Sequence, residues 1–153
     1  MMGDTVARIL VCDDAPDIRE LLSIVLGEEH EVLTAEDGRH CLDRLDSDGP
    51  FQALVLDVMM PELDGFEVLR QIRLESRWRD LPVVMLTAKV DESSYMTGYR
   101  LGADAYVSKP FDPVDLEEVL RRILRQSPDE RAEARKEELA RSRILWQLEN
   151  RSS

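Results

Sequence analysis

The sequence predicts an α/β fold: a doubly wound, five-stranded parallel sheet with helices on both faces, followed by a C-terminal helical extension. Five short runs of β-branched or leucine-rich residues alternate with five amphipathic stretches, which is typical of repeated βα units. The first, third and fourth runs are continuously apolar, whereas the second and fifth are mixed. Strands buried on both faces are continuously apolar, so the mixed runs belong at the edges. The simplest strand order is therefore 2-1-3-4-5, with right-handed crossovers.

Each element is bounded by recognisable signals. The expected strands are Arg8–Cys12, Glu31–Ala35, Ala53–Asp57, Pro82–Thr87 and Ala105–Ser108. The expected helices are Pro16–Leu26, Arg39–Leu45, Phe66–Glu75, Glu92–Leu101 and Pro113–Arg125. Pro16 and Pro113 stand where first-turn prolines belong, Asp112 is placed to cap the fifth helix, and Gly102 follows the fourth. The first helix is expected to bury the stripe Ile18, Leu21, Leu22 and Val25.

Composition excludes several classes of protein. The chain has 153 residues, of which 43% are hydrophobic and 34% charged, as in ordinary globular proteins. A formal net charge of −12 disfavours direct binding to nucleic acid or to an anionic membrane surface. The apolar runs are too short for a membrane span or a signal peptide. Cys12 and Cys41 fit no metal or redox spacing, which favours buried reduced thiols in a cytoplasmic protein.

Chemistry-bearing side chains follow the strands at one end of the predicted sheet. In doubly wound sheets the ligand crevice lies at the carboxyl ends of the strands, where the winding reverses, here between strands one and three. Strand one ends in Asp13-Asp14 and strand three ends in Asp57. Three carboxylates this close need a cation or a proton, and Mg²⁺ prefers oxygen ligands. Strands four and five add the hydroxyl of Thr87 and the ammonium of Lys109, groups suited to phosphoryl oxygens. Asp57 is the best candidate nucleophile because it is the central carboxylate.

The residues around this end of the sheet resemble the receiver domain of two-component response regulators. The resemblance covers residues 7 to about 126 and is carried by Asp13-Asp14, the segment 54–65 (LVLDVMMPELDG), Leu86-Thr87-Ala88 and the segment 105–111 (AYVSKPF). It implies that Asp57 accepts a phosphoryl group from a sensor histidine kinase or a histidine phosphotransfer protein. It also implies a switch that catalyses only its own phosphorylation and dephosphorylation, and is not otherwise an enzyme.

The same resemblance assigns the remaining site residues. Mg²⁺ would be bound by Asp13, Asp14, Asp57 and the backbone carbonyl of Met59. Thr87 would receive a phosphoryl oxygen, Lys109 would pair with it, and Tyr106 would be the switch aromatic. The Lys109–Pro110 bond would be cis, which only X-Pro bonds adopt at low cost. Met59 and Lys89 would flank the path of the hydrolytic water, and Met59 has no group to orient it, so slow self-dephosphorylation is expected.

The sequence argues against three other classes of protein. A haloacid-dehalogenase-type phosphatase needs a second aspartate two residues beyond the nucleophile, where this chain has Met59. A nucleotide or flavin binder needs a glycine-rich turn after strand one, where the acidic pair would repel phosphate. A phosphorylation-independent interaction module does not need the complete set of site residues. The cognate kinase, the pathway and the output stay open, and so does the choice between a stand-alone receiver and part of a longer regulator.

Residues 127–153 are predicted to form a separate C-terminal unit next to a receiver domain of residues 1–126. Ser127 to Glu130 reads as a capping box, so a new helix should run from Pro128 to about Asn150. Its apolar residues are too irregular for a coiled coil. Three uses stay open: folding back onto its own or a partner's receiver, linking to an output domain as a signalling helix, or forming a solvated tail. We favour an extended helix whose Trp146 end packs on another chain. A phosphorylation-promoted homodimer is expected through this helix or through a surface on helix four, strand five and helix five; the alternative is that this surface is merely solvated. The exposed residues expected there are Tyr99, Arg100, Asp104, Tyr106, Glu118, Arg121 and Arg122.

Overall fold

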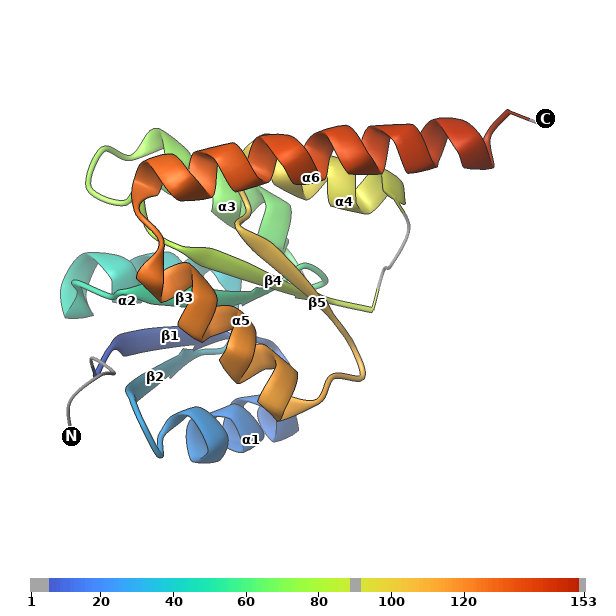
Figure 1. Ribbon diagram of the computed structural model, residues 1–153. Helices are drawn as coiled ribbons and strands as arrows, with labels where there is room; N and C mark the ends of the chain where they lie inside the picture. Colours follow the sequence, from blue (N-terminus) through green and yellow to red (C-terminus); the bar gives the residue numbers. More distant parts are fainter. Residues whose placement is uncertain (1–5, 89–91, 152–153) are drawn as a thin grey trace.

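A five-stranded parallel sheet forms the centre of the molecule, in the order β2-β1-β3-β4-β5 (Figure 1). The computed structural model describes residues 6–88 and 92–151. Its strands are β1 (Arg8–Cys12), β2 (Glu31–Ala35), β3 (Ala53–Asp57), β4 (Val83–Thr87) and β5 (Ala105–Ser108). Every residue of β3 and β4 is buried, whereas β2 and β5 are partly exposed. The predicted strand order and edge positions are therefore confirmed.

Six helices connect and follow the strands within the described residues. They are α1 (Pro16–Leu26), α2 (Gly38–Asp48), α3 (Gly65–Leu74), α4 (Glu92–Leu101), α5 (Pro113–Arg125) and α6 (Pro128–Glu149). Helices α2 and α3 begin one residue earlier than predicted because Asp37 and Asp64 cap them, accepting hydrogen bonds from the His40 and Glu67 amides. No helix in the described ranges combines the length and apolarity that crossing a bilayer requires.

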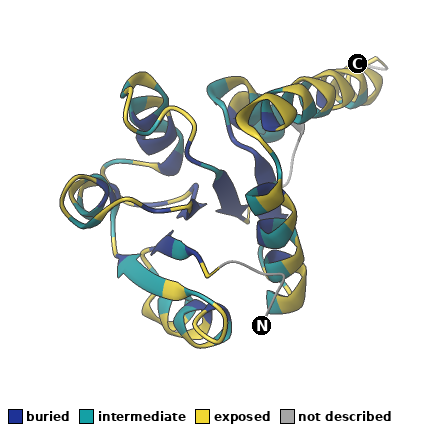
Figure 2. Ribbon diagram, turned by 60° about the vertical axis from the view of Figure 1, so that its left-hand side comes forward, coloured by how far each residue is buried: buried dark blue, intermediate teal, exposed yellow. Residues whose placement is uncertain are grey.

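Two apolar layers sandwich the sheet (Figure 2). On one face, α1 and α5 pack on alternate strand residues such as Val55 and Leu86; on the other, α2 and α3 pack on Leu54 and Met85. Leu22 and Leu26 of α1 are fully buried, but Leu21 is 39% exposed. The prediction that Leu21 belongs to the buried stripe is wrong because Leu26, one turn beyond Leu22, takes the core position.

One glycine fixes the close approach of α3 to the end of β3. A Cβ atom at Gly65 would lie 2.2 Å from the backbone oxygen of Asp57, a distance that no side chain tolerates. The Gly65 amide donates a hydrogen bond to the Val58 carbonyl at 2.9 Å, which closes the loop over residues 58–65. Val58, which follows Asp57 at the end of β3, is thereby held at the carboxyl edge of the sheet.

Helix α6 lies along α4 of the same chain (Figure 1). It begins with the predicted capping box, in which Ser127 and Glu130 each accept from the other's backbone amide. The prediction that Tyr99, Asp104 and Tyr106 are freely exposed is wrong. The Asp104 side chain is 1% exposed and paired with arginines, and the two tyrosines are half-buried beneath α6. Packing of Trp146, which is 41% exposed, on another chain stays a prediction, as does the division of the chain at residue 126.

Candidate functional site at the carboxyl edge of the sheet

The three predicted carboxylates converge at the carboxyl ends of β1 and β3. Oxygen atoms of Asp13, Asp14 and Asp57 all lie within 4.8 Å of one another. Asp13 and Asp57 are buried, at 0% and 2% exposure, whereas Asp14 is exposed and opens the cluster to solvent. The Asp13 carboxylate is oriented by its Oδ1 atom, which accepts a hydrogen bond from the Ala15 amide at 2.9 Å. The cluster thus consists of two buried carboxylates, Asp13 and Asp57, and one solvent-exposed carboxylate, Asp14.

Lys109 brings the compensating positive charge from the end of β5. Its Nζ atom lies 2.9 Å from Asp13 Oδ2 and 3.4 Å from Asp57 Oδ2. The Lys109 amide donates to the Thr87 carbonyl at 2.8 Å, which continues the β4–β5 ladder and fixes where the side chain starts. Burial lowers the pKa of the ammonium, but contact with Asp13 and the charge of Asp57 outweigh it, so the pKa lies above its ordinary value. Lys109 is therefore a cation.

Asp57 lies in an environment that disfavours a negative charge. Burial and the neighbouring Asp13 charge raise its pKa from 3.8 to about 6, against the opposing effects of Lys109 and the Met59 amide. That amide donates to Asp57 Oδ1 at 3.1 Å, which leaves Oδ2 facing Lys109. At neutral pH the carboxylate is predominantly ionised, yet its charge is only partly compensated by described groups.

The donor set fits a magnesium ion. The Asp13 Oδ2 atom is buried and, within the described part of the chain, has the Lys109 ammonium beside it but accepts no hydrogen bond of good geometry. Mg²⁺ binds oxygen ligands at about 2.0–2.1 Å in an octahedron, so two oxygens on one ion lie no more than about 4.2 Å apart. Carboxylates within 4.8 Å of one another meet that requirement with small side-chain adjustments. The carbonyl of Met59 as a further ligand stays a prediction.

Thr87 and Tyr106 occupy two different environments. Thr87 is fully buried at the end of β4, in register with Ser108. The Tyr106 hydroxyl donates to the Ser94 carbonyl at 3.0 Å, and its ring packs edge-on against Tyr95 and Tyr99 with centroids 4.8 and 5.3 Å away. A Cβ atom at Gly98 would lie 1.7 Å from that hydroxyl, so this glycine gives the ring its place against α4. The Lys109–Pro110 bond is cis, as the resemblance implied.

An apolar hollow beside Lys109 was not predicted from the sequence. It has a volume of about 490 Å³ and is lined by Ile18, Leu21, Ala88, Lys109, Pro110 and Phe111. The exposure of Leu21 is the signal for it, because a leucine outside the helix stripe is available to line a surface. Lys89, the second residue expected along the water path, lies outside the described residues.

Comparison with known proteins identifies the family. The family model described as "Response regulator receiver domain" matches residues 9–121. The chain belongs to this family. "Probable transcriptional regulator ycf27" of Galdieria sulphuraria is 46% identical to the receiver over 122 residues, which cover 78% of this chain and 46% of that relative. "Response regulator MprA" of Mycolicibacterium vanbaalenii is 46% identical over 127 residues, which cover 82% of this chain and 54% of the relative.

The same family appears among solved structures. The chemotaxis response regulator CheY4 of Vibrio cholerae superposes on this receiver with a TM-score of 0.74 and 34% identity, covering 78% of this chain and 99% of that one. The chain spans about half the length of the curated relatives it matches. The predicted fold and family of this two-component response regulator receiver are thereby confirmed.

Proposed function

We propose that this receiver accepts a phosphoryl group on Asp57 from a phosphohistidine, in a reaction that depends on Mg²⁺. The observation that supports it best is the convergence of two buried carboxylates, one exposed carboxylate and a lysine ammonium at one edge of the sheet. The receiver catalyses only its own phosphorylation and dephosphorylation.

The residues of the site divide the chemistry between them. Asp57 Oδ2 attacks phosphorus in line; the new bond is O–P, and the bond that breaks joins phosphorus to the donor imidazole, which leaves with its electron pair and takes up a proton. The Lys109 ammonium balances the negative charge of the phosphoryl oxygens. The Met59 amide donates a hydrogen bond to Asp57 Oδ1, so Oδ2 is the attacking atom. Asp13, Asp14 and Asp57 would hold Mg²⁺, which supplies charge neutralisation for the incoming phosphoryl group.

Thr87 and Tyr106 carry the signal away from the site. A phosphoryl oxygen on Asp57 attracts the Thr87 hydroxyl, and Tyr106 turns from α4 into the space that this movement vacates. The environment of α4 and β5 changes as a result. Such a population shift needs only a few kcal/mol of differential contact between the two states.

The donor docks beside α1. The hollow lined by Leu21, Ala88 and Phe111 is adjacent to Lys109 and is predominantly apolar, so it suits the side of a helix that presents a histidine. The partner is a sensor histidine kinase or a histidine phosphotransfer protein. Two relatives carry names of transcriptional and response regulators, and the matched residues make up only about half of each of them. Control of transcription would therefore act through a region outside the matched residues.

Intact-mass spectrometry tests the assignment. Incubation with acetyl phosphate and Mg²⁺ is expected to add one phosphoryl group, and chelation of Mg²⁺ is expected to abolish the addition. Asp57→Asn should remove it as well, whereas Asp43→Asn, at an exposed aspartate of α2, should not. An Asp57→Asn protein that still gains one phosphoryl mass would contradict the proposal.

A further inference from the structure

Helix α6 covers the face formed by α4 and β5 through a seam that is mainly polar. The residues of α6 nearest the receiver recur at alternate spacings of four and three, as in a coiled-coil seam: Arg131, Arg135, Glu138, Ser142 and Leu145. Only the last of them is apolar. The large apolar residues Ile144 and Leu148 are 57% and 54% exposed and do not hold the helix in place. Leu139 and Leu145 are only half-buried, whereas the two buried residues of α6, Arg131 and Ser142, are polar, so its attachment depends mainly on polar contacts.

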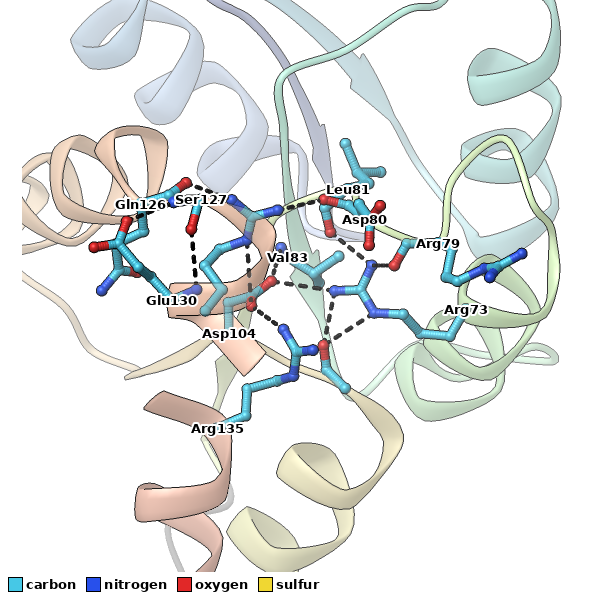
Figure 3. A network of polar contacts seen from close by, with 12 residues as sticks. Arg73, Arg79, Asp80, Leu81, Val83, Asp104, Gln126, Ser127, Glu130 and Arg135 are labelled. Carbon is cyan, nitrogen blue, oxygen red and sulfur yellow. Dashed lines mark hydrogen bonds and ion pairs between the residues drawn. The ribbon is translucent and has the colours of Figure 1, made fainter. Parts of the chain in front are cut away.

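Those contacts converge on Asp104, the residue before β5. Its Oδ1 atom lies 2.6 Å from Arg135 Nη1 and 3.6 Å from Arg131 Nε. Its Oδ2 atom lies 3.1 Å from Arg73 Nη2 of α3 and accepts a hydrogen bond from the Val83 amide at 2.9 Å. Figure 3 shows the Asp104 carboxylate between the guanidinium groups of Arg73 and Arg135. One buried carboxylate thus ties α6 to α3, β4 and β5.

The first turn of α6 is anchored in the same place. Arg131 is 6% exposed and donates to the carbonyl oxygens of Gln126 and Asp80 at 2.8 and 2.6 Å. Three guanidinium groups share the Asp104 carboxylate, so their charges are incompletely balanced. A buried ion network of this kind gives specificity to one arrangement and adds little net stability, because desolvation offsets the attraction. Such a contact is well suited to a helix that is docked in one state and released in another.

The far half of the seam lies over the switch aromatic. A pocket of about 260 Å³, partly open to solvent, lies between Tyr95 and Tyr99 of α4, Tyr106 of β5, and residues 138–145 of α6. The Tyr106 ring lines this pocket together with Tyr95 and Tyr99 of α4. If the ring turned toward Thr87 while α6 stayed docked, the pocket would grow and the ring contacts with Tyr95 and Tyr99 would be lost. Unfilled volume beneath a packed element is destabilising, so docking of α6 favours the observed Tyr106 position.

We propose that α6 is an intramolecular cover of the α4–β5 face, docked while Asp57 is unphosphorylated and released when Asp57 is phosphorylated. The proposal rests on the proposed function, because phosphorylation is the event that moves Tyr106. Coupling between two sites is reciprocal: a phosphoryl group that weakens docking of α6 is itself disfavoured by docked α6. Release exposes Tyr95 and Tyr99 together with the adjoining surface of α5. The cover thereby keeps an interaction surface closed until the signal arrives.

Hydrogen exchange on the full chain, with and without beryllofluoride and Mg²⁺, tests the release. Beryllofluoride stands in for the phosphoryl group on Asp57. We expect amide exchange over residues 131–145 to accelerate at least fivefold, the lower end of typical coupling, while exchange over residues 53–65 slows. Slowing over 53–65 with no change over 131–145 would overturn the cover and leave the proposed function standing. No response in either segment would overturn both.

A pair of matched variants tests the role of the Asp104 contacts. Arg135→Gln keeps a good helix former but removes the closest guanidinium from Asp104. It should accelerate exchange over 131–145 without beryllofluoride and speed labelling by acetyl phosphate severalfold. Arg143→Gln makes the same change at an exposed position of α6 and should alter neither measurement. Equal behaviour of the two variants would show that Asp104 does not hold the cover.

Discussion

At the scale of single residues, the site concentrates like charges that its own lysine balances only in part. The pKa of Asp57 is raised to about 6 because its carboxyl group is buried beside Asp13. A carboxyl whose pKa is higher in the folded than in the unfolded state stabilises the fold when protonated, fully below pH 3.8. That contribution is lost as the pH rises through about 6. At neutral pH the Asp57 charge lowers the free energy of unfolding, and a bound cation would offset this loss.

Asp57→Asn should therefore stabilise the metal-free protein at pH 7. The rise from 3.8 to about 6 corresponds to at most about 3 kcal/mol, so we expect the free energy of unfolding to increase by about 1–3 kcal/mol. The difference between variant and parent should grow between pH 4 and pH 6 and then level off. Urea denaturation in chelator at several pH values measures it, with Asp43→Asn as the surface control. A variant no more stable than the parent at pH 7 would show that the Asp57 charge is already compensated.

Met59 should govern the lifetime of the phosphoryl group. Its side chain is 56% exposed, two residues beyond Asp57, and a thioether has no strong hydrogen-bonding group with which to orient water. We expect loss of the phosphoryl group over minutes or longer, and faster loss in Met59→Asn because an amide can position the attacking water. Decay of the phosphorylated mass with time gives both rates. Faster decay in the parent than in the variant would contradict this reasoning.

At the scale of helices and strands, local chemistry predicted most of the architecture. The strand order followed from the contrast between continuously apolar and mixed strands, and the Ser127 capping box placed the start of α6 correctly. The caps Asp37 and Asp64 could have been found by the same reasoning. Packing of α6 on its own receiver was among the alternatives, but the residues through which it docks could not be predicted, because hydrophobic periodicity does not detect a polar seam of Arg131, Arg135 and Ser142. Residues brought together by strand ends were predictable, whereas ion pairs between distant elements depend on the assembled fold.

Gly65 makes the element scale testable at the site itself. A methyl group there would meet the Asp57 carbonyl at 2.2 Å, so Gly65→Ala must displace either β3 or α3. We expect a loss of about 1–3 kcal/mol in stability together with weaker Mg²⁺ binding, followed by urea denaturation and titration calorimetry. Gly49→Ala, where a Cβ would lie 2.9 Å from the Leu45 carbonyl, is a control distant from the site. It should cost stability and leave Mg²⁺ affinity unchanged. Equal Mg²⁺ affinity in both variants would show that Gly65 does not position Asp57.

At the scale of the whole molecule, the receiver and its C-terminal helix differ in what holds them together. Both apolar layers of the receiver are built from residues before 127, and none of their buried members belongs to α6. Helix α6 instead joins through Arg131 and Arg135. Removal of α6 therefore takes away a cover and its cations but no core. The sheet, the acidic cluster and Lys109 should remain in place.

Truncation after Gln126 should accordingly leave phosphorylation by acetyl phosphate intact while changing the oligomeric state. Without α6, Tyr95, Tyr99 and Asp104 become accessible on a face that also carries the arginines of α5, and such a mixed apolar and charged surface favours pairing across a two-fold axis. Sedimentation velocity over a range of concentrations should detect a dimer that the full chain forms less readily. Truncation after Asn150 removes no residue of the α6 seam and should sediment like the parent. A shortened receiver that fails to fold, or that has the mass distribution of the full chain, would contradict this division between core and cover.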